Sequence, residues 1–99
     1  MSSKVIAALD EVRGRCVGLK VNFPDTCAGV DPAIDKIQVF IRKATKGVFT
    51  LEHEQDLADT LYGVKTYCDW LIKEYPETRG DCIPLMKTID YLIMVESVH

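Results

Sequence analysis

The 99-residue chain has few of the side chains from which catalytic and metal sites are usually built. Its two histidines are His53 and His99, and its glycines are scattered, so there is no Gly-rich phosphate-binding loop. His53-Glu54 begins an HExxH zinc motif, but the second histidine is missing. With Glu52 and Asp56, His53 would offer a metal only a weak, exposed site, and a solvated acidic helix end is the expectation. We expect no catalytic residues, no metal and no cofactor.

Long apolar runs and a surplus of basic residues are absent as well. No segment approaches the ~20 apolar residues that a transmembrane helix requires, and Asp10 and Glu11 interrupt the apolar stretch near the N-terminus. That interruption does not fit a secretory signal. The formal net charge is −3, whereas nucleic-acid-binding domains usually carry an excess of Lys and Arg. We therefore expect a cytoplasmic protein that binds neither a membrane nor a nucleic acid.

Four cysteines are present, and no two of them have the CxxC spacing of zinc-ribbon or thioredoxin-type sites. An even number of cysteines in a short chain permits two disulfides, with three possible pairings. Cys16 and Cys68 fall on predicted core faces, where a free thiol behaves as a small hydrophobic group. Two alternatives stay open: reduced thiols in a cytoplasmic protein, or at least one disulfide in a secreted one, with Cys27–Cys82 as the first candidate.

Apolar residues recur with helical spacing in four segments, at about residues 3–19, 31–46, 51–75 and 82–97. The third segment is the most regular, and its stripe alternates spacings of four and three: Leu57, Leu61, Val64, Cys68, Leu71 and Tyr75. The other expected core-facing residues are Val5, Leu9, Val12, Cys16, Leu19, Ile34, Ile37, Ile41, Ala44, Cys82, Leu85, Met86, Ile89, Leu92 and Ile93. The sequence predicts one all-α domain over residues 1–99, an antiparallel four-helix bundle with a long first loop at about residues 20–30.

Residues at the ends of these segments agree with the helical interpretation. Asp31-Pro32 suits a helix start, Gly47 suits a left-handed stop, and Thr50 suits the N-cap of the third helix. The stretch 37–42 is rich in β-branched residues, so a strand is the alternative there. The caps on either side favour a helix.

The tripeptide Arg79-Gly80-Asp81 matches the one that integrins recognise. Its glycine also suits a turn before the fourth helix, and its aspartate suits the cap of that helix. Tripeptides arise easily by chance, so we interpret this one as a turn followed by a helix cap.

The third helix carries aromatic and polar side chains on the face opposite its core stripe. Tyr62, Thr66 and Trp70 are spaced four residues apart and share that face, with Asp59 and Lys73 beside them. Tyr and Trp bury a large area while keeping a polar tip, which favours them in protein interfaces. We expect these residues to bind a partner.

The fourth helix is apolar on nearly all sides. With its core stripe facing inward, Tyr91, Met94, Val95 and Val98 project outward. A helix of this kind is normally covered on more than one side. Either the chain's own first loop or N-terminus covers it, or these residues belong to an interface with another protein or a second copy.

These patterns predict a small non-enzymatic protein–protein interaction module, such as an adaptor, an inhibitor or an immunity-like protein, with no small-molecule substrate. Residues 1–47 hold eight basic and five acidic residues, a net charge of +3, and residues 48–99 hold four and ten, a net charge of −6. The two halves either compensate each other within the bundle or steer a partner. The expected partner is another protein or a second copy in a homodimer. The alternative is a secreted, disulfide-stapled helical carrier of an apolar ligand.

Overall fold

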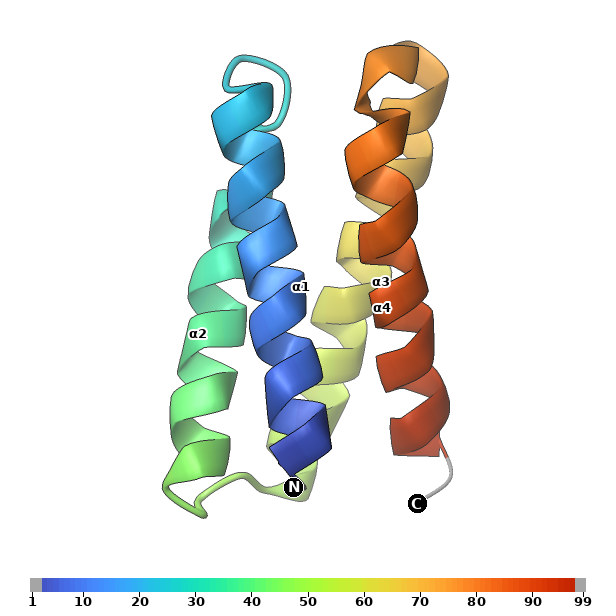
Figure 1. The fold of residues 1–99 in the computed structure, drawn as a ribbon. Coiled ribbons are helices and arrows are strands. Elements are labelled where there is room, and N and C mark those ends of the chain that lie inside the picture. Colours follow the sequence, from blue (N-terminus) through green and yellow to red (C-terminus); the bar gives the residue numbers. More distant parts are fainter. Residues whose placement is uncertain (1–2, 98–99) are drawn as a thin grey trace.

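The computed structural model describes the backbone of residues 3–97 and the side chains of residues 3–95, and this part of the chain is an all-α bundle (Figure 1). Its long helices are α1 (Ser3–Asn22), α2 (Asp31–Thr45), α3 (Leu51–Glu74) and α4 (Arg79–Ser97). Two short 3₁₀ helices, η1 (Ala28–Val30) and η2 (Pro76–Thr78), precede α2 and α4. The structure confirms the predicted four-helix fold, and the β-branched stretch 37–42 is helical.

Consecutive helices run in opposite directions, and the bundle closes because α1 and α3 each pack against both α2 and α4. The start of α1, the end of α4 and the α2–α3 link lie at one end, which we call the terminal end (Figure 1). The α1–α2 and α3–α4 links lie at the other, which we call the distal end. The molecule measures 38 × 23 × 20 Å. No helix within residues 3–97 combines the length and apolarity needed to cross a membrane.

The predicted apolar stripes form the core. Those of α1 and α3 are buried: Val5, Leu9, Val12, Cys16 and Leu19, and Leu57, Leu61, Val64, Cys68 and Leu71. The prediction for Tyr75 is wrong, because this residue follows the end of α3 and is 37% exposed. α4 buries Cys82, Leu85, Ile89 and Leu92. On α2, Ile37 and Phe40 are buried, whereas Ile34 and Ile41 are half-buried. α2 is therefore rotated about its own axis relative to the prediction, so that Phe40 faces the core more directly than Ile34 and Ile41 do.

The first link is shorter than the predicted loop over residues 20–30. α1 continues to Asn22, and only residues 23–27 separate it from η1. The amides of Phe23 and Cys27 donate to the carbonyls of Leu19 and Phe23, at 2.8 and 2.9 Å, so the chain leaves α1 in a tight turn. Pro24 disfavours helical backbone at Phe23, which explains why α1 ends at Asn22.

The start of α4 also differs from the prediction. The helix begins at Arg79, three residues earlier than predicted, so Arg79-Gly80-Asp81 lies in its first turn. Asp81 is therefore not the helix cap, and its Oδ2 instead accepts a hydrogen bond from Asn22 Nδ2 at 3.2 Å. Thr78, which ends η2, is fully buried, and its hydroxyl donates to the Tyr75 carbonyl at 2.8 Å.

The α2–α3 link has the end residues that the sequence predicted. Gly47 adopts a φ of +74°, a left-handed conformation that glycine tolerates best. Thr50 caps α3 in a capping box with His53, whose Nδ1 accepts the Thr50 amide hydrogen at 2.9 Å. The His53 ring also packs against Phe49, with ring centroids 5.6 Å apart. His53 thus has a structural role at the helix start.

Candidate interaction surface

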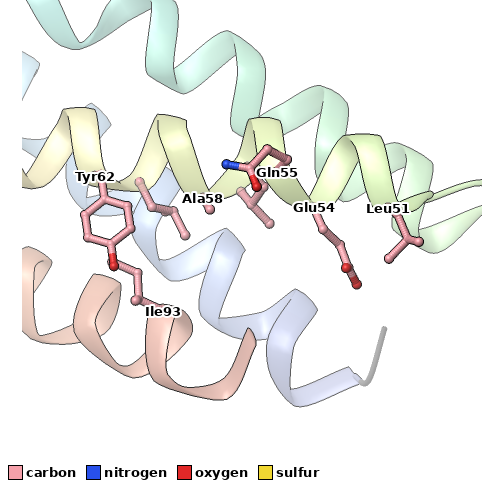
Figure 2. A pocket seen from close by; sticks show the side chains of 8 residues that line it. Leu51, Glu54, Gln55, Ala58, Tyr62 and Ile93 are labelled. Atoms are coloured by element: carbon pink, nitrogen blue, oxygen red, sulfur yellow. The ribbon is translucent and has the colours of Figure 1, made fainter. Parts of the chain in front are cut away.

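An open groove runs between α3 and α4 toward the terminal end of the bundle (Figure 2). Its volume is about 310 Å³. The first four turns of α3 form one wall, and the side chain of Ile93 on α4 faces it, with the Tyr62 ring pointing across toward Ile93 (Figure 2). The residues that line it are Leu51, Glu54, Gln55, Leu57, Ala58, Leu61, Tyr62 and Ile93. We call this feature the α3–α4 groove.

Large apolar side chains are exposed along this groove. Leu51 is 81% exposed and Tyr62 is 52% exposed, and both lie on the groove wall formed by α3. Leu51 is the first residue of α3, so it extends beyond the core stripe that starts at Leu57. On α4, Met94 is 61% exposed and follows Ile93 directly in the chain, although it does not itself line the groove. The groove therefore offers apolar surface that the described chain leaves uncovered.

The groove lining contains one charged side chain, and it is acidic. Glu54 is the one charged residue that lines it, and Asp59, one turn further along α3, accepts a hydrogen bond from Gln55 Nε2 at 3.2 Å. The nearest base on α3 toward the distal end is Lys65, whose ammonium group bonds Asp90 of α4 at 2.6 Å. The hydrogen bond and the charge of Asp90 raise the pKa of Lys65. That base is thus already paired with Asp90, and Glu54 is the charged side chain in the groove lining.

Trp70 belongs to a different surface from Tyr62, although the sequence placed both on one stripe. The Trp70 ring stacks on Tyr67 with centroids 5.7 Å apart, and it meets Tyr75 edge-on at 5.8 Å. The Tyr67 hydroxyl donates to the Thr26 carbonyl at 2.8 Å, which ties these aromatics to the α1–α2 link. Trp70 remains 46% exposed, but its own chain already covers one face of the ring.

The remaining predicted contact residues are dispersed. Thr66 and Lys73 are exposed on α3. Tyr91 lies in a separate shallow groove against α1, beside Ala7 and Lys87.

On α4 the prediction for Val95 is wrong in part, because this residue is half-buried and packs against the core instead of projecting fully outward. Its position, three residues after the buried Leu92, places it on the flank of the core stripe. Val98 lies outside the described residues. The residues predicted on α3 and α4 therefore do not form one continuous patch.

Sequence reasoning missed Leu51 and assigned Ile93 wholly to the core. Leu51 follows the N-cap Thr50 directly, at a position that the core stripe does not reach. One feature of the sequence could have indicated its exposure: it is an apolar residue in a first helical turn that also contains the acidic residues Glu52 and Glu54. Ile93 packs partly against the core while its other side faces the groove, a double role that spacing alone cannot reveal.

A second exposed apolar strip lies on the outer face of α1. Val21 is 71% exposed and Val17 is 37% exposed, and nothing lies within 4 Å of the position that a Cβ would take at Gly14 or Gly18. Several of the charges neighbouring this face are paired, Arg13 with Asp10 within α1 and Lys20 with Asp31 of α2. It therefore serves as an apolar control surface outside the groove.

Comparison with known proteins gave no match: no family model fits the chain, and no curated protein and no solved structure is similar to it. The geometry and chemistry of the surface are therefore the basis for a functional proposal.

Proposed function

We propose that this protein is a non-enzymatic interaction module, an adaptor or an inhibitor, whose α3–α4 groove binds an apolar segment with basic flanks on a protein partner. The observation that carries the proposal is the combination of Leu51 and Tyr62, both more than half exposed, with an acidic side chain, Glu54, in one groove. Exposed apolar surface with a polar rim is typical of protein-binding sites.

The apolar surface supplies the affinity in this proposal. Fully burying a Leu or Met side chain contributes about 1.5–3 kcal/mol, so covering Leu51 and Met94 would offset a large part of the cost of association. Tyr62 adds an aromatic ring whose hydroxyl stays able to form a hydrogen bond at the rim. The three side chains together resemble the small group of contacts that usually dominates a protein interface.

The charge of the groove selects the kind of partner. A two-fold homodimer through this face would place the same acidic groups of both copies near one another, since the same patch faces itself. Like charges in an interface disfavour association, whereas a basic segment meets Glu54 and Asp59 with opposite charge. We therefore favour a partner other than a second copy. The carrier alternative depended on disulfides, and the four cysteines of the structure are free thiols, so it gains no support.

A pair of synthetic helical peptides tests the proposal. One carries leucines on one face and lysines on the other, and the second replaces each lysine with glutamate. We expect the leucine–lysine peptide to bind in a fluorescence-anisotropy titration and the leucine–glutamate peptide to bind at least tenfold more weakly.

Matched variants then locate the site. Leu51→Ser and Tyr62→Ala should each weaken binding of the leucine–lysine peptide by about tenfold, since 1.4 kcal/mol of lost burial corresponds to that factor. Val21→Ser removes an equally exposed apolar side chain from α1 and should leave binding unchanged. Similarly, Glu54→Lys should weaken binding more than Glu77→Lys, whose carboxylate lies at the distal end. Equal effects of the groove and control variants would contradict the proposal.

A further inference from the structure

All four cysteines meet inside the distal half of the bundle, although each comes from a different element. Cys16 lies on α1, Cys27 in the α1–α2 link, Cys68 on α3 and Cys82 near the start of α4. All four side chains have no solvent-exposed surface, and all four are free thiols. Within residues 3–97 no group of three or more Cys, His, Asp or Glu side chains is placed to hold a metal ion. The chemistry open to this cluster is therefore that of thiols with one another.

Cys82 is the centre of the cluster. It lies near enough to Cys16, Cys27 and Cys68 to raise the pKa of each of their thiols. Burial raises the pKa of the Cys16 thiol to about 12, and burial followed by the nearby Cys82 raises the pKa of Cys68. The thiols of Cys16 and Cys68 are thus protonated in the folded protein at neutral pH, and the causes of the raised pKa of Cys68 include a hydrogen bond with Cys82.

The helical hairpin explains why these two residues meet. Cys68 lies six residues before the end of α3 at Glu74, and Cys82 lies six residues after the start of η2 at Pro76. At ~1.5–2 Å of rise per residue, each lies roughly 10–12 Å from the turn at Tyr75. Both positions also belong to the core stripes of adjacent, antiparallel helices. The pair is therefore level across the α3–α4 contact, as a disulfide between neighbouring helices requires.

We propose that Cys68 and Cys82 form a disulfide between α3 and α4 when the protein meets a low-molecular-weight disulfide such as oxidised glutathione. In the first step one of the two thiols loses its proton, and its thiolate attacks a sulfur of the oxidant. This forms a mixed disulfide and releases one glutathione thiolate, which takes up a proton. The second protein thiolate then attacks the protein sulfur of the mixed disulfide and releases the second glutathione. Two protein thiols are oxidised to one disulfide, and one glutathione disulfide is reduced to two thiols.

Burial controls the rate of this reaction. Neither side chain reaches solvent in the closed bundle, so the oxidant gains access only when the distal end opens locally. The reaction should therefore be slow in buffer and faster in urea below the unfolding transition. Once formed, the link closes the loop over residues 68–82 in the unfolded chain, so it should raise the urea midpoint of unfolding. It lies at the opposite end of the bundle from Leu51, so the proposed groove does not depend on it.

Peptide mapping identifies the pair directly, because trypsin places each cysteine on its own peptide: residues 16–20, 21–36, 66–73 and 80–87. The full-length folded protein is incubated with oxidised glutathione in mildly alkaline buffer, with and without sub-denaturing urea. Remaining thiols are alkylated, and the protein is digested without reduction. We expect one linked species that joins peptides 66–73 and 80–87, with Cys16 and Cys27 alkylated. A reducing agent should release both peptides.

Variants separate this pair from its neighbours. Cys16→Ala and Cys27→Ala should keep the link, whereas Cys68→Ala should abolish it, with helix content checked by circular dichroism. A link between peptides 21–36 and 80–87 in the wild-type protein would overturn the proposal. So would glutathione retained on Cys68 or Cys82, or four alkylated thiols after exposure in urea. The wild-type map is decisive even where an alanine variant folds poorly.

Discussion

His53 shows how a residue that resembles a functional group can have a structural explanation. Histidine is a common metal ligand, and the acidic residues next to His53 made a weak metal site one interpretation of the sequence. In the structure its ring instead lies at the start of α3 and completes the capping box. There Nδ1 accepts the Thr50 amide hydrogen, Nε2 lies 3.0 Å from the Lys43 ammonium nitrogen, and Phe49 packs against the ring. The sequence predicted the Thr50 cap correctly, but it did not indicate that His53 would complete it.

We expect His53→Ala to lower the free energy of unfolding by about 1 kcal/mol, because the Thr50 amide loses its acceptor. His53→Gln should lose much less, since a glutamine at this position can accept the same hydrogen bond. Urea unfolding followed by circular dichroism measures both. If the two variants were equally stable, the capping role of this side chain would be wrong.

We expect the buried thiols to make the folded protein less stable at alkaline pH. In the unfolded chain a thiol ionises near its ordinary pKa, about 8.5, whereas burial raises the pKa of Cys16 to about 12 and also raises that of Cys68. Above the unfolded value the unfolded chain binds fewer protons than the folded one, so stability falls as pH rises.

The predicted loss begins near pH 9 and continues toward pH 12. Urea midpoints measured across this range test it. A Cys16→Ala, Cys68→Ala double variant should have a shallower pH dependence than the wild-type protein. An identical dependence in the two proteins would show that these thiols do not cause the loss.

At the scale of elements, periodicity located all four helices, whereas the links required contacts that are distant in sequence. The last three residues of α1, Lys20, Val21 and Asn22, do not belong to the core. The apolar stripe therefore ends at Leu19, whereas the helix continues to Asn22. The residues before Cys82 form η2 and the first turn of α4, where Thr78 is fully buried. Burial of a polar residue by a neighbouring turn leaves no periodic signal in the sequence, so the early start of α4 was not predictable.

The close approach of Gly29 to Tyr67 joins the α1–α2 link to α3. Replacing Gly29 with alanine, which adds one methyl group, tests this contact. A Cβ at Gly29 would lie 3.0 Å from Tyr67 Oη, which donates to the Thr26 carbonyl. Gly29→Ala should therefore cost about 1–3 kcal/mol of stability, as overpacking usually does. It should also change the fluorescence of Trp70, because its stacking partner moves.

Gly18→Ala on α1 is the matched control. Nothing lies within 4 Å of its Cβ position, and alanine favours a helix interior over glycine by about 0.5–1 kcal/mol, so this change should stabilise the protein. Urea unfolding compares the two variants. If Gly29→Ala were as stable as Gly18→Ala, Tyr67 would not be held where the structure places it.

At the scale of the whole molecule, the sequence predicted the bundle because its stripes are regular, and it predicted a surplus of exposed apolar residues. The sequence did not predict which of the exposed apolar residues lie together on the surface, because the groove depends on how α3 and α4 face each other. Tyr62 and Trp70 share one stripe on a helical wheel, yet one lies in the α3–α4 groove and the other stacks on Tyr67. The uneven charge along the chain was visible in the sequence, and the structure places the acidic Glu54 in the groove.

The central claim is that the α3–α4 groove is the binding surface. Titration of the ¹⁵N-labelled protein with the leucine–lysine peptide, followed by NMR, maps the contact without any substitution. The account predicts that amide shifts change along residues 51–62 and around Ile93, while those near Val17 and Val21 stay in place. Shift changes centred on the outer face of α1, or spread evenly over the bundle, would contradict it.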